Sequence, residues 1–580
     1  MNATHSFSVW APGRDRVRLR TGGADRDMAR GERGWWHPEP GTAAVPGTDY
    51  AYLLDDDPTP LPDPRSLWQP SGVHGPSRVY DHAAFEWTDG GWTGRALAGS
   101  VLYELHVGTF TAEGTFDAAR TRLDHLADLG VDMVEVMPVN AFDGVHGWGY
   151  DGVLWGAVHQ RYGGPDAFKR FVDACHARGL GVLLDVVYNH LGPSGCYLPR
   201  FGPYLHGANA WGPALNLDGP GSDEVRRYVI DNALGWLRDF HLDGLRLDAV
   251  HALVDRRATH LLTELSAEAD ALAARVRRPL SLIAESDLND PAMVTAREAG
   301  GHGMTAQWAD DLHHGLHAAL TGERQGYYAD FATPQALPVT LRRVFLHAGT
   351  WSSFRGRHHG APVDTRVIPG SRFLCYLQNH DQVGNRAAGD RLSATVTPGL
   401  LACGAALMLC SPYTPMLFMG EEWAAGTPWC YFASFTDPGL ADAVRNGRRR
   451  EFAAHGWGST EVPDPMAGST RDRSVLCWEE RDREPHRSVL RLYRDLIAAR
   501  RAHPDLADPR LDRFAVAADA DGRWLVLHRG RLRVVVNLRS LASAGPLDRP
   551  GREIVLASRE AELTADGVRL PAESFAIVAT

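Results

Sequence analysis

The strongest constraint on the fold is an alternation of strand-like and helix-like segments between about residues 99 and 503. Repeated strand–helix units predict a parallel sheet with helices outside it. Over about 400 residues, this pattern favours an α/β fold with an enlarged (β/α)8 TIM barrel; a doubly wound open sheet is the alternative. No GxGxxG segment follows the first strand, which disfavours a dinucleotide-binding sheet. Seven segments have the near-continuous apolar character of strands buried on both faces: VLYELHV, VDMVEVMPV, LGVLLDVV, DGLRLD, PLSLIAE, FLCYLQ and PMLFMG.

Local signals predict where the helices between these strands begin and end. Thr115 can cap a helix that Gly130 ends, and Pro165 stands at the start of the next helix. Ser222 is expected to cap a third helix, because an apolar face at helical spacing follows it. The last barrel helix is expected at about 486–503.

Both flanks of the barrel region are predicted to be β. Residues 1–96 contain short strand-like runs between Gly, Pro and Asp clusters and predict an N-terminal immunoglobulin-like β-sandwich. Residues 61–77 form a Pro- and Gly-rich connection of irregular backbone. Four apolar runs after Pro504 predict a C-terminal β-sandwich. The predicted domains are therefore 1–96, a barrel with loop insertions at 97–504, and 505–580.

The 580 residues carry a formal net charge of −11, with 44% hydrophobic and 23% charged residues. This composition is ordinary for a globular protein. The negative balance disfavours a nucleic-acid binder, which needs a basic face for phosphates. A neutral substrate suits such a surface.

Cysteine usage and hydropathy favour a cytoplasmic location. The seven cysteines are odd in number and none belongs to a CxxC spacing, so neither a disulfide framework nor a zinc site is expected. The N-terminal MNATHSFSVW lacks the basic stretch and apolar core of a signal peptide. The longest apolar stretch begins LLACGAALMLC at Leu400 and is shorter than the about 20 residues that a bilayer span needs. It therefore predicts a buried helix and no membrane association.

Polar residues gather where the predicted strands end, which is where functional side chains lie in such a barrel. Carboxylates, histidines and an arginine would then converge on one mouth, and buried acids are costly unless they have a task or a partner. Each acid alone could cap a helix, and Asp185 could instead hold loops or Arg246. The four segments are DVVYNH with Asp185 and His190, DGLRLDAVH with Arg246, Asp248 and His251, AESDLND with Glu285, and YLQNHDQVGN with His380 and Asp381.

Two carboxylates that face each other across a glycosidic bond are what glycoside cleavage requires, about 5–5.5 Å apart in a retaining enzyme. Arg246 lies two residues before Asp248 on a strand, so both point to one face. The positive charge should keep Asp248 ionised as a nucleophile. Glu285 must begin protonated, which requires a less polar setting or a nearby negative charge. Asp381 can stabilise the positive charge that develops on the sugar ring.

The four segments resemble, in order and approximate spacing, those of the α-amylase clan, glycoside hydrolase family 13. The resemblance covers the whole predicted barrel, and the N-terminal β region resembles a starch-type binding module. It implies a retaining double displacement with Asp248 as nucleophile, Glu285 as acid/base and Asp381 as transition-state stabiliser.

The same resemblance implies a substrate-binding set around the three acids. Tyr150, in GWGYDG after the second strand, matches the aromatic platform for the −1 sugar, with core packing as the alternative. Trp211 could stack on a sugar or pack within its loop. Trp308 and Asp310 precede a helix near the mouth and are expected to contact substrate. The remaining members of the set are Asp185, His190, Arg246, His251 and His380.

Within the clan, four segments resemble the subfamily that releases trehalose: LPDPRSLWQPSGVHGPS, AESDLND, AQWADDLHHGLHAALTGERQGYY and QNHDQVGNR. The implied reaction is hydrolysis of the α-1,4-glucosidic bond next to the terminal α,α-trehalose of maltooligosyl trehalose, which yields trehalose and a maltooligosaccharide. The implied partner in trehalose biosynthesis is a separate maltooligosyltrehalose synthase. No cofactor and no metal are expected, because only the first Asn of YNH matches a calcium ligand of the clan.

Other readings of the same motifs remain open. A glycogen or α-glucan branching enzyme shares the three acids and differs in letting a sugar hydroxyl resolve the covalent intermediate. Branching enzymes usually follow the acid/base with Glu-Ser-Thr, whereas this chain has Ser286-Asp287. A debranching enzyme of the isoamylase type is a third candidate. A catalytically dead glycan-binding protein is disfavoured, because such relatives lose one or more of the acids that this chain keeps.

Overall fold

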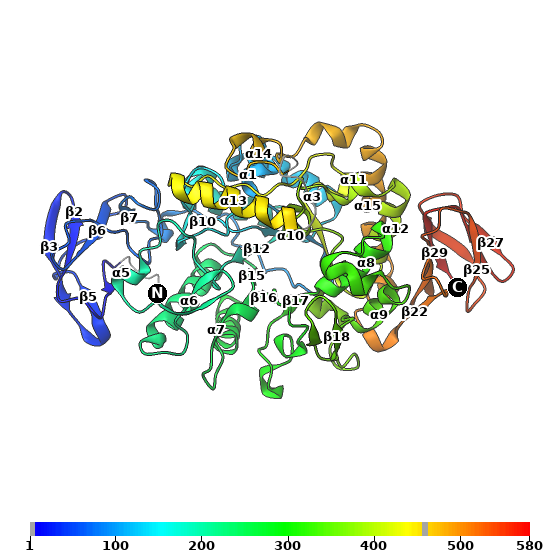
Figure 1. Ribbon diagram of the computed structural model, residues 1–580, viewed down its shortest axis with the longest axis horizontal. Helices are drawn as coiled ribbons and strands as arrows, with labels where there is room; N and C mark the ends of the chain where they lie inside the picture. The colour runs from blue at the N-terminus through cyan, green and yellow to red at the C-terminus, as the bar shows by residue number, and fades with distance from the viewer. Residues whose placement is uncertain (1–5, 455–461) are drawn as a thin grey trace.

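The structure is a computed structural model that describes residues 6–454 and 462–580. Its parts follow one long axis, as Figure 1 shows. Small antiparallel sheets lie at the N-terminal end, a closed barrel with its helices lies in the middle, and further antiparallel sheets lie at the C-terminal end.

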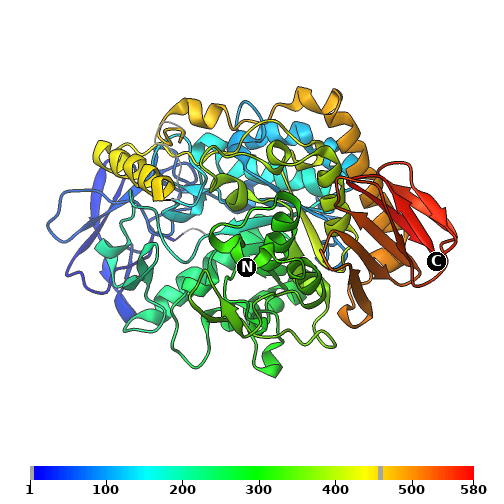
Figure 2. The same cartoon turned by 45° about the vertical axis from the view of Figure 1, so that its right-hand side comes forward.

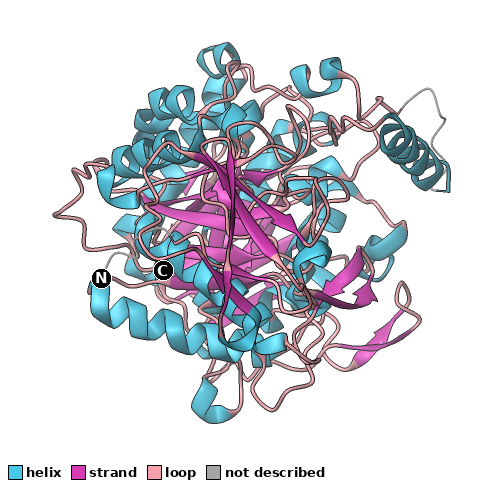
Figure 3. Cartoon of the chain, turned by 90° about the vertical axis from the view of Figure 1, so that its left-hand side faces the viewer, coloured by secondary structure: helices cyan, strands magenta, loops and turns pink. Residues whose placement is uncertain are grey.

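Eight parallel strands close into a barrel, which confirms the predicted (β/α)8 fold and excludes the open doubly wound sheet. Figure 3 shows the strands gathered at the centre with helices around them. In chain order the strands are β8 (Leu102–Leu105), β9 (Met133–Val136), β12 (Gly181–Val186), β15 (Gly244–Leu247), β16 (Ser281–Ala284), β17 (Ala306–Trp308), β20 (Phe373–Cys375) and β21 (Thr414–Phe418).

The sixth strand, β17, is the barrel strand that the sequence pattern does not predict. Its three residues are too few to display either a period of two or an extended apolar run. Parallel pairing fixes it on both sides, with Ala284 of β16 opposite Gln307 and Leu374 of β20 opposite Trp308. Pairing with both neighbours in the closed barrel therefore stabilises a strand in a segment whose sequence alone does not predict one.

The barrel interior has an apolar layer and, toward the carboxyl ends of the strands, a polar layer. In the polar layer Glu104 is in register with Glu135 on the next strand, and Asp185 with Arg246. All four side chains are buried. Strand side chains alternate between the two faces, so each inward position is repeated every second residue. The apolar layer consists of Leu97, Leu102, Met133, Leu183, Ile283, Ala306, Trp308, Leu374, Tyr376 and Met416.

Most helix ends follow the predicted signals. The Thr115 side chain accepts a hydrogen bond from the backbone N–H of Ala118 at 3.2 Å and caps α2 (Phe116–Ala119), and Gly130 ends α3 (Leu123–Leu129) with a φ of 94°. The single helix predicted between these two signals is divided by a 3-10 turn at Arg120–Arg122. The prediction that Ser222 caps a helix is wrong. Ser222 is the first residue of α6 (Ser222–Asp239) and makes no capping bond, because the chain enters the helix through Gly221 at a φ of 79°.

Two further helices match their sequence signals. The apolar stretch at Leu400 belongs to α12 (Pro398–Leu409), which is buried along almost its whole length, as predicted. The last barrel helix is α15 (His486–Ala502). Within residues 6–454 and 462–580, no helix combines the length and apolar character needed to cross a membrane.

The flanking regions are antiparallel on both sides of the barrel. The N-terminal strands form one sheet in the order β1-β5-β4 and another in the order β3-β2-β6-β7, and the C-terminal strands order as β22-β23-β24-β29-β26 and β25-β28-β27. Figure 2 brings the C-terminal sheets toward the viewer, where they lie against the end of the barrel. The bounds are β1 (Val9–Trp10), β2 (Val17–Thr21), β3 (Ala24–Asp27), β4 (Ala29–Arg30), β5 (Trp35–His37), β6 (Asp49–Leu54), β7 (Ser77–Arg78), β22 (Phe514–Ala518), β23 (Trp524–Arg529), β24 (Leu532–Asn537), β25 (Ser543–Pro546), β26 (Glu553–Ala557), β27 (Glu562–Thr564), β28 (Gly567–Leu570) and β29 (Ser574–Ala579).

Candidate active site

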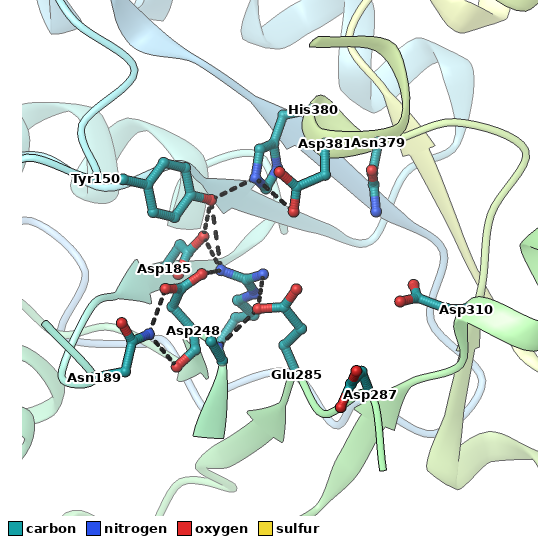
Figure 4. Close-up of polar contacts among 12 residues, drawn as sticks. Tyr150, Asp185, Asn189, Asp248, Glu285, Asp287, Asp310, Asn379, His380 and Asp381 are labelled. Carbon is teal, nitrogen blue, oxygen red and sulfur yellow. Dashed lines mark hydrogen bonds and ion pairs between the residues drawn. The ribbon is translucent and has the colours of Figure 1, made fainter. Parts of the chain in front are cut away.

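Arg246 joins the carboxyl groups of Asp185, Asp248 and Glu285 at the carboxyl ends of the strands. Figure 4 labels these three acids. The Arg246 guanidinium is fully buried and contacts three carboxyl groups. Nη1 donates to Oδ2 of Asp185 at 2.5 Å and to Oδ1 of Asp248 at 2.9 Å. Nη2 lies 2.7 Å from Oε2 of Glu285. The ring of Trp308 lies against the guanidinium, 4.1 Å from Cζ to the ring centroid. One side chain thus joins residues from four neighbouring strand ends.

The surroundings give the two predicted catalytic carboxyl groups opposite proton states. Burial acts to raise the pKa of Asp248, but Arg246 and a hydrogen bond from Asn189 bring it below its usual value. Burial raises the pKa of Glu285 well above its usual value, and the negative charges of Asp248 and Asp381 raise it further against the opposing effect of Arg246. Asp248 can therefore act as an anion while Glu285 carries a proton.

Hydrogen bonds from neighbouring groups orient this carboxyl pair. Nδ2 of Asn189 donates to Oδ2 of Asp248 at 2.5 Å and to its backbone carbonyl at 2.8 Å. The backbone N–H of Ala249 donates to Oε2 of Glu285 at 2.7 Å. Ala249 has a φ of 39°, in a region that a residue with a Cβ adopts rarely and at an energetic cost. This strained turn directs a backbone N–H at Glu285.

Tyr150 links the Arg246 cluster to His380. Its hydroxyl donates to Oδ2 of Asp185 at 2.5 Å and lies 2.7 Å from Nε2 of His380. The Tyr150 and His380 rings are stacked, with centroids 5.0 Å apart and planes 22° apart. Burial raises the pKa of Asp185 to about 6, against the opposing effect of Arg246. The half-buried Tyr150 ring is therefore fixed at its hydroxyl by two site residues.

Glu104 is a member of the site that the sequence analysis did not identify. Its Oε1 lies 2.5 Å from Nδ1 of His380, and its Oε2 accepts from the His380 backbone N–H at 3.0 Å. Burial lowers the pKa of His380, but Asp381 and Glu104 raise it to about 10. His380 is therefore a cation at neutral pH. The available signal was a single acid inside the apolar run VLYELHV.

Asp381 lies on the opposite side of the drawn cluster from Asp248 and Glu285 in Figure 4. Its side chain is 36% exposed, compared with 12% for Asp248 and 18% for Glu285. Its Oδ2 lies 3.5 Å from Nε2 of His380, and its Oδ1 accepts from Nδ2 of Asn385 at 3.3 Å. The most accessible of the three acids is thus the one expected to face the charge that develops on the sugar.

His190 and His251 lie at the rim of the site beside Trp211. Nε2 of His190 lies 3.0 Å from the backbone carbonyl of Tyr150. The His190 ring is parallel to Trp211 within 15° at 6.1 Å, and the His251 ring meets Trp211 edge-on at 5.9 Å. Nε2 of His251 lies 3.9 Å from Oδ1 of Asp287. Trp211 is 49% exposed, so its ring is not packed in a core.

Trp308 lies deeper than its expected place near the mouth. It is 2% exposed, belongs to the apolar layer of the barrel and lies against Arg246, and its contact with substrate stays a prediction. Asp310 is half-buried and accepts a hydrogen bond from the hydroxyl of Tyr376. Burial raises the pKa of Asp310 to about 6. Figure 4 places Asp310 on the Glu285 side of the cluster.

The described residues contain no group of three or more His, Cys, Asp or Glu side chains arranged to hold a metal ion. Asn189 is the residue that matches a calcium ligand of the clan. Its Nδ2 donates hydrogen bonds to Oδ2 and to the backbone carbonyl of Asp248. The expectation of no metal and no cofactor stays a prediction.

The fold and the site define a class. The α-amylase catalytic domain family matches residues 80–198, and a family described as a domain of unknown function, DUF3459, matches residues 509–577. A crystal structure from Salmonella typhimurium, of a protein provisionally named an alpha amylase, has a TM-score of 0.90 and 38% identity over 99% of this chain and 97% of that one. A closed parallel barrel with a carboxyl pair at its mouth and an α-amylase catalytic domain make this chain a glycoside hydrolase.

Curated relatives narrow the class to a family. A protein from Mycobacterium tuberculosis named malto-oligosyltrehalose trehalohydrolase is 54% identical over 99% of this chain and 98% of its own length. Proteins of the same name from Arthrobacter ramosus and Saccharolobus solfataricus are 56% identical over 99% of this chain and 99% of theirs, and 42% identical over 86% and 85%. The chain belongs to the malto-oligosyltrehalose trehalohydrolase family.

Proposed function

We propose that the chain hydrolyses the α-1,4-glucosidic bond next to the terminal α,α-trehalose of maltooligosyl trehalose and releases trehalose and a maltooligosaccharide. The opposite proton states of Asp248 and Glu285 around one buried guanidinium carry the chemistry of this proposal. The relatives named malto-oligosyltrehalose trehalohydrolase support the choice of substrate.

In the first step, the Asp248 carboxylate attacks C1 of the glucosyl unit at the cleavage point. Glu285 gives its proton to the glycosidic oxygen, the bond from C1 to that oxygen breaks, and trehalose leaves. The maltooligosyl chain remains as an ester of Asp248. Asp381 stabilises the positive charge that builds on the ring between these two states.

In the second step, water replaces Asp248. The ester has no negative charge, so one of the groups that raise the pKa of Glu285 is lost while Arg246 stays in place. The Glu285 carboxylate then accepts a proton from water, whose oxygen attacks C1 with retention of configuration. The products are the maltooligosaccharide, ionised Asp248 and protonated Glu285, and the cycle consumes one water.

The other residues of the proposed site position these groups and the −1 sugar. Tyr150 and His380 would lie along the sugar, with the cationic His380 offering a charge-assisted donor to a hydroxyl. His190, His251 and Asp310 would contact substrate at the rim. Arg246, Asp185 and Trp308 form the support beneath.

The cellular setting and the domain limits are also proposals. All seven cysteines are free, which fits a reducing cytoplasm. A separate maltooligosyltrehalose synthase would supply the substrate. The limits 1–96, 97–504 and 505–580 remain our division of the chain, supported by the strand order of the flanking sheets.

The runner-up is an α-glucan branching enzyme. A curated branching enzyme from Pseudoalteromonas atlantica is 27% identical over 74% of this chain and 62% of its own length, well below the trehalohydrolase relatives. The purified protein should release trehalose from maltotriosyl trehalose and act poorly on maltopentaose, measured by chromatography of the products. New α-1,6 branches in amylose, with no trehalose released, would reverse the assignment.

A further inference from the structure

A cavity lies away from the barrel mouth, beside the N-terminal sheets. It is bounded by α6, by the segment 63–87 and by Ser6 and Ser8. Its volume of about 560 Å³ falls within the about 300–1,000 Å³ of small-molecule sites, which occur preferentially where domains meet. None of the proposed active-site residues lines it. Figure 1 shows α6 next to the N-terminal region.

One face of α6 supplies a partly exposed amide and, beneath it, aromatic rings that are 2–3% exposed and form the floor of this cavity. Tyr228, Asn232 and Trp236 are spaced four residues apart, which places them in one row along the helix, and Phe240 follows at its end. Oδ1 of Asn232 accepts hydrogen bonds from Trp236 and from the hydroxyl of Tyr188, so the amide is held in one orientation.

The segment 63–87 supplies an aromatic wall, formed by Phe85 and Trp87. Trp87 stacks on His241 with centroids 3.9 Å apart and planes 13° apart, and Phe85 meets Trp87 edge-on at 4.8 Å. Both Phe85 and Trp87 are only partly buried, so part of each ring remains open. Rings that are fixed and partly open can pack against the apolar C–H faces of a sugar.

A buried lysine contacts the Phe85 and Trp87 rings of this wall. Lys169 is the only lysine in a chain with 60 basic residues, so arginine is otherwise used throughout. Its Nζ donates to the backbone carbonyl of His82 at 3.0 Å, and burial lowers its pKa to about 8. The ammonium lies 5.3–5.7 Å from the ring centroids of Tyr80, Phe85, Trp87 and Phe240. This cation holds the wall through ring contacts.

The polar groups at the edge of the cavity favour a neutral ligand. Four aspartates and two arginines line it, and Nη1 of Arg65 lies 3.2 Å from Oδ2 of Asp231. This acidic excess opposes phosphates and other anions, whereas carboxylates accept hydrogen bonds from the hydroxyls of a sugar. The four aspartates are Asp63, Asp81, Asp231 and Asp239, and the arginines are Arg65 and Arg238.

Gly235 gives an independent indication that the space above α6 is kept open. A glycine inside a helix costs about 1 kcal/mol relative to alanine. A Cβ added at Gly235 would meet only Oδ2 of Asp239, at 3.8 Å, so packing does not require a glycine there. Its backbone instead borders the cavity, where the missing side chain leaves room for a ligand to approach the helix.

We propose that this cavity is a second saccharide site that binds a glucosyl segment of a neutral α-glucan. The open parts of Phe85 and Trp87 pack against sugar faces, and the Asn232 amide and the exposed Asp81 and Asp231 bind hydroxyls. The ligand class rests on the chain being a glycoside hydrolase and does not depend on the trehalose-releasing reaction. The site would hold a glucan chain near the enzyme while another segment occupies the barrel mouth.

The test counts bound maltoheptaose per chain by equilibrium dialysis, in an Asp248→Asn background that prevents turnover. Two molecules should bind to the parent. Adding Gly235→Leu should leave one, since the leucine side chain enters the cavity, whereas Gly235→Ala should keep two. Both substitutions improve helix propensity, so loss of folding is not the expected cause of a change. Trp87→Ala should weaken the second site about tenfold, the loss of one aromatic contact.

A single bound maltoheptaose in the parent would overturn the proposal, as would two unchanged affinities in the Gly235→Leu variant. On the otherwise native chain, Gly235→Leu should keep the rate of trehalose release within about twofold, because the cavity is separate from the catalytic acids. Failure of trehalose release in the native chain would count against the proposed reaction and leave the maltoheptaose count unaffected.

Discussion

Two buried arginines in the barrel domain show how the same side chain serves different purposes. Arg246, at the barrel mouth, contacts three carboxyl groups. Arg500, on α15, donates to the backbone carbonyls of Leu409, Ser411 and Tyr413 at 2.7–2.9 Å. Both are at most 3% exposed.

The difference between their partners shows in their pKa values. Burial lowers the pKa of Arg500 to about 10, and the raising effects of Cys410, Cys375 and Asp132 do not offset it. Burial acts in the same direction on Arg246, but Asp185 and Glu285 raise its pKa well above the usual value. A backbone carbonyl cannot gain or lose a proton beside the arginine charge. A carboxyl group can. The first arrangement suits a structural role and the second suits acid–base chemistry.

The largest effect is expected from removing the Asp248 carboxylate, whose pKa Arg246 lowers. Asp248→Asn should lower kcat on maltotriosyl trehalose at least about 10⁴-fold, because an amide cannot form the ester intermediate. The variant should still bind substrate, which calorimetry can measure. A rate near that of the native enzyme would remove Asp248 from the role of nucleophile.

The next effect tests the cation itself. Arg246→Met should lower kcat/KM by about 10²–10³-fold, the usual result of removing one electrostatic contact from an active site. Arg246 holds down the pKa of Asp248, so its loss should move the acidic limb of the pH profile to higher pH. An unshifted acidic limb with the same rate loss would indicate that Arg246 acts only through packing.

Arg500→Met should act on stability and leave the chemistry unchanged. Three or more carbonyls lose a buried donor, so unfolding should become easier by about 2–4 kcal/mol. Arg501→Met is the matched control on the same helix, since Arg501 is 50% exposed and pairs with Asp132 at 2.8 Å. Thermal unfolding and kcat/KM should be measured together. A large fall in kcat/KM for folded Arg500→Met would break the contrast with Arg246.

The smallest expected effect concerns His380. Glu104 helps to raise its pKa to about 10, so the imidazolium charge is present below that pH and is lost as the pH rises through it. Glu104→Gln should lower this pKa and move the loss of activity to lower pH, with at most a severalfold change at pH 7. The measurement is kcat/KM between pH 6 and 10. An unchanged alkaline limb would show that the charge of His380 does not limit the reaction.

The sequence predicted those parts of the site whose residues follow the alternation of a β-strand. Arg246 and Asp248 could be placed on one face because strand side chains alternate, and the 2.9 Å contact between Nη1 of Arg246 and Oδ1 of Asp248 agrees with that placement. Glu104 could not be singled out, because a lone acid in an apolar strand does not reveal which strand lies beside it. Trp308 was placed too near the surface because a three-residue strand has no readable period.

The sequence by itself determined the class of the chain: strand–helix repeats, four polar strand ends and the type of each acid follow from residue order. Only the tertiary structure decided the proton states and the supporting contacts. A pKa depends on burial and on charges from other strands, so Glu285 acquires its raised value only where Asp248, Asp381 and Arg246 meet. The cavity beside α6 likewise exists only because the segment 63–87 lies beside that helix.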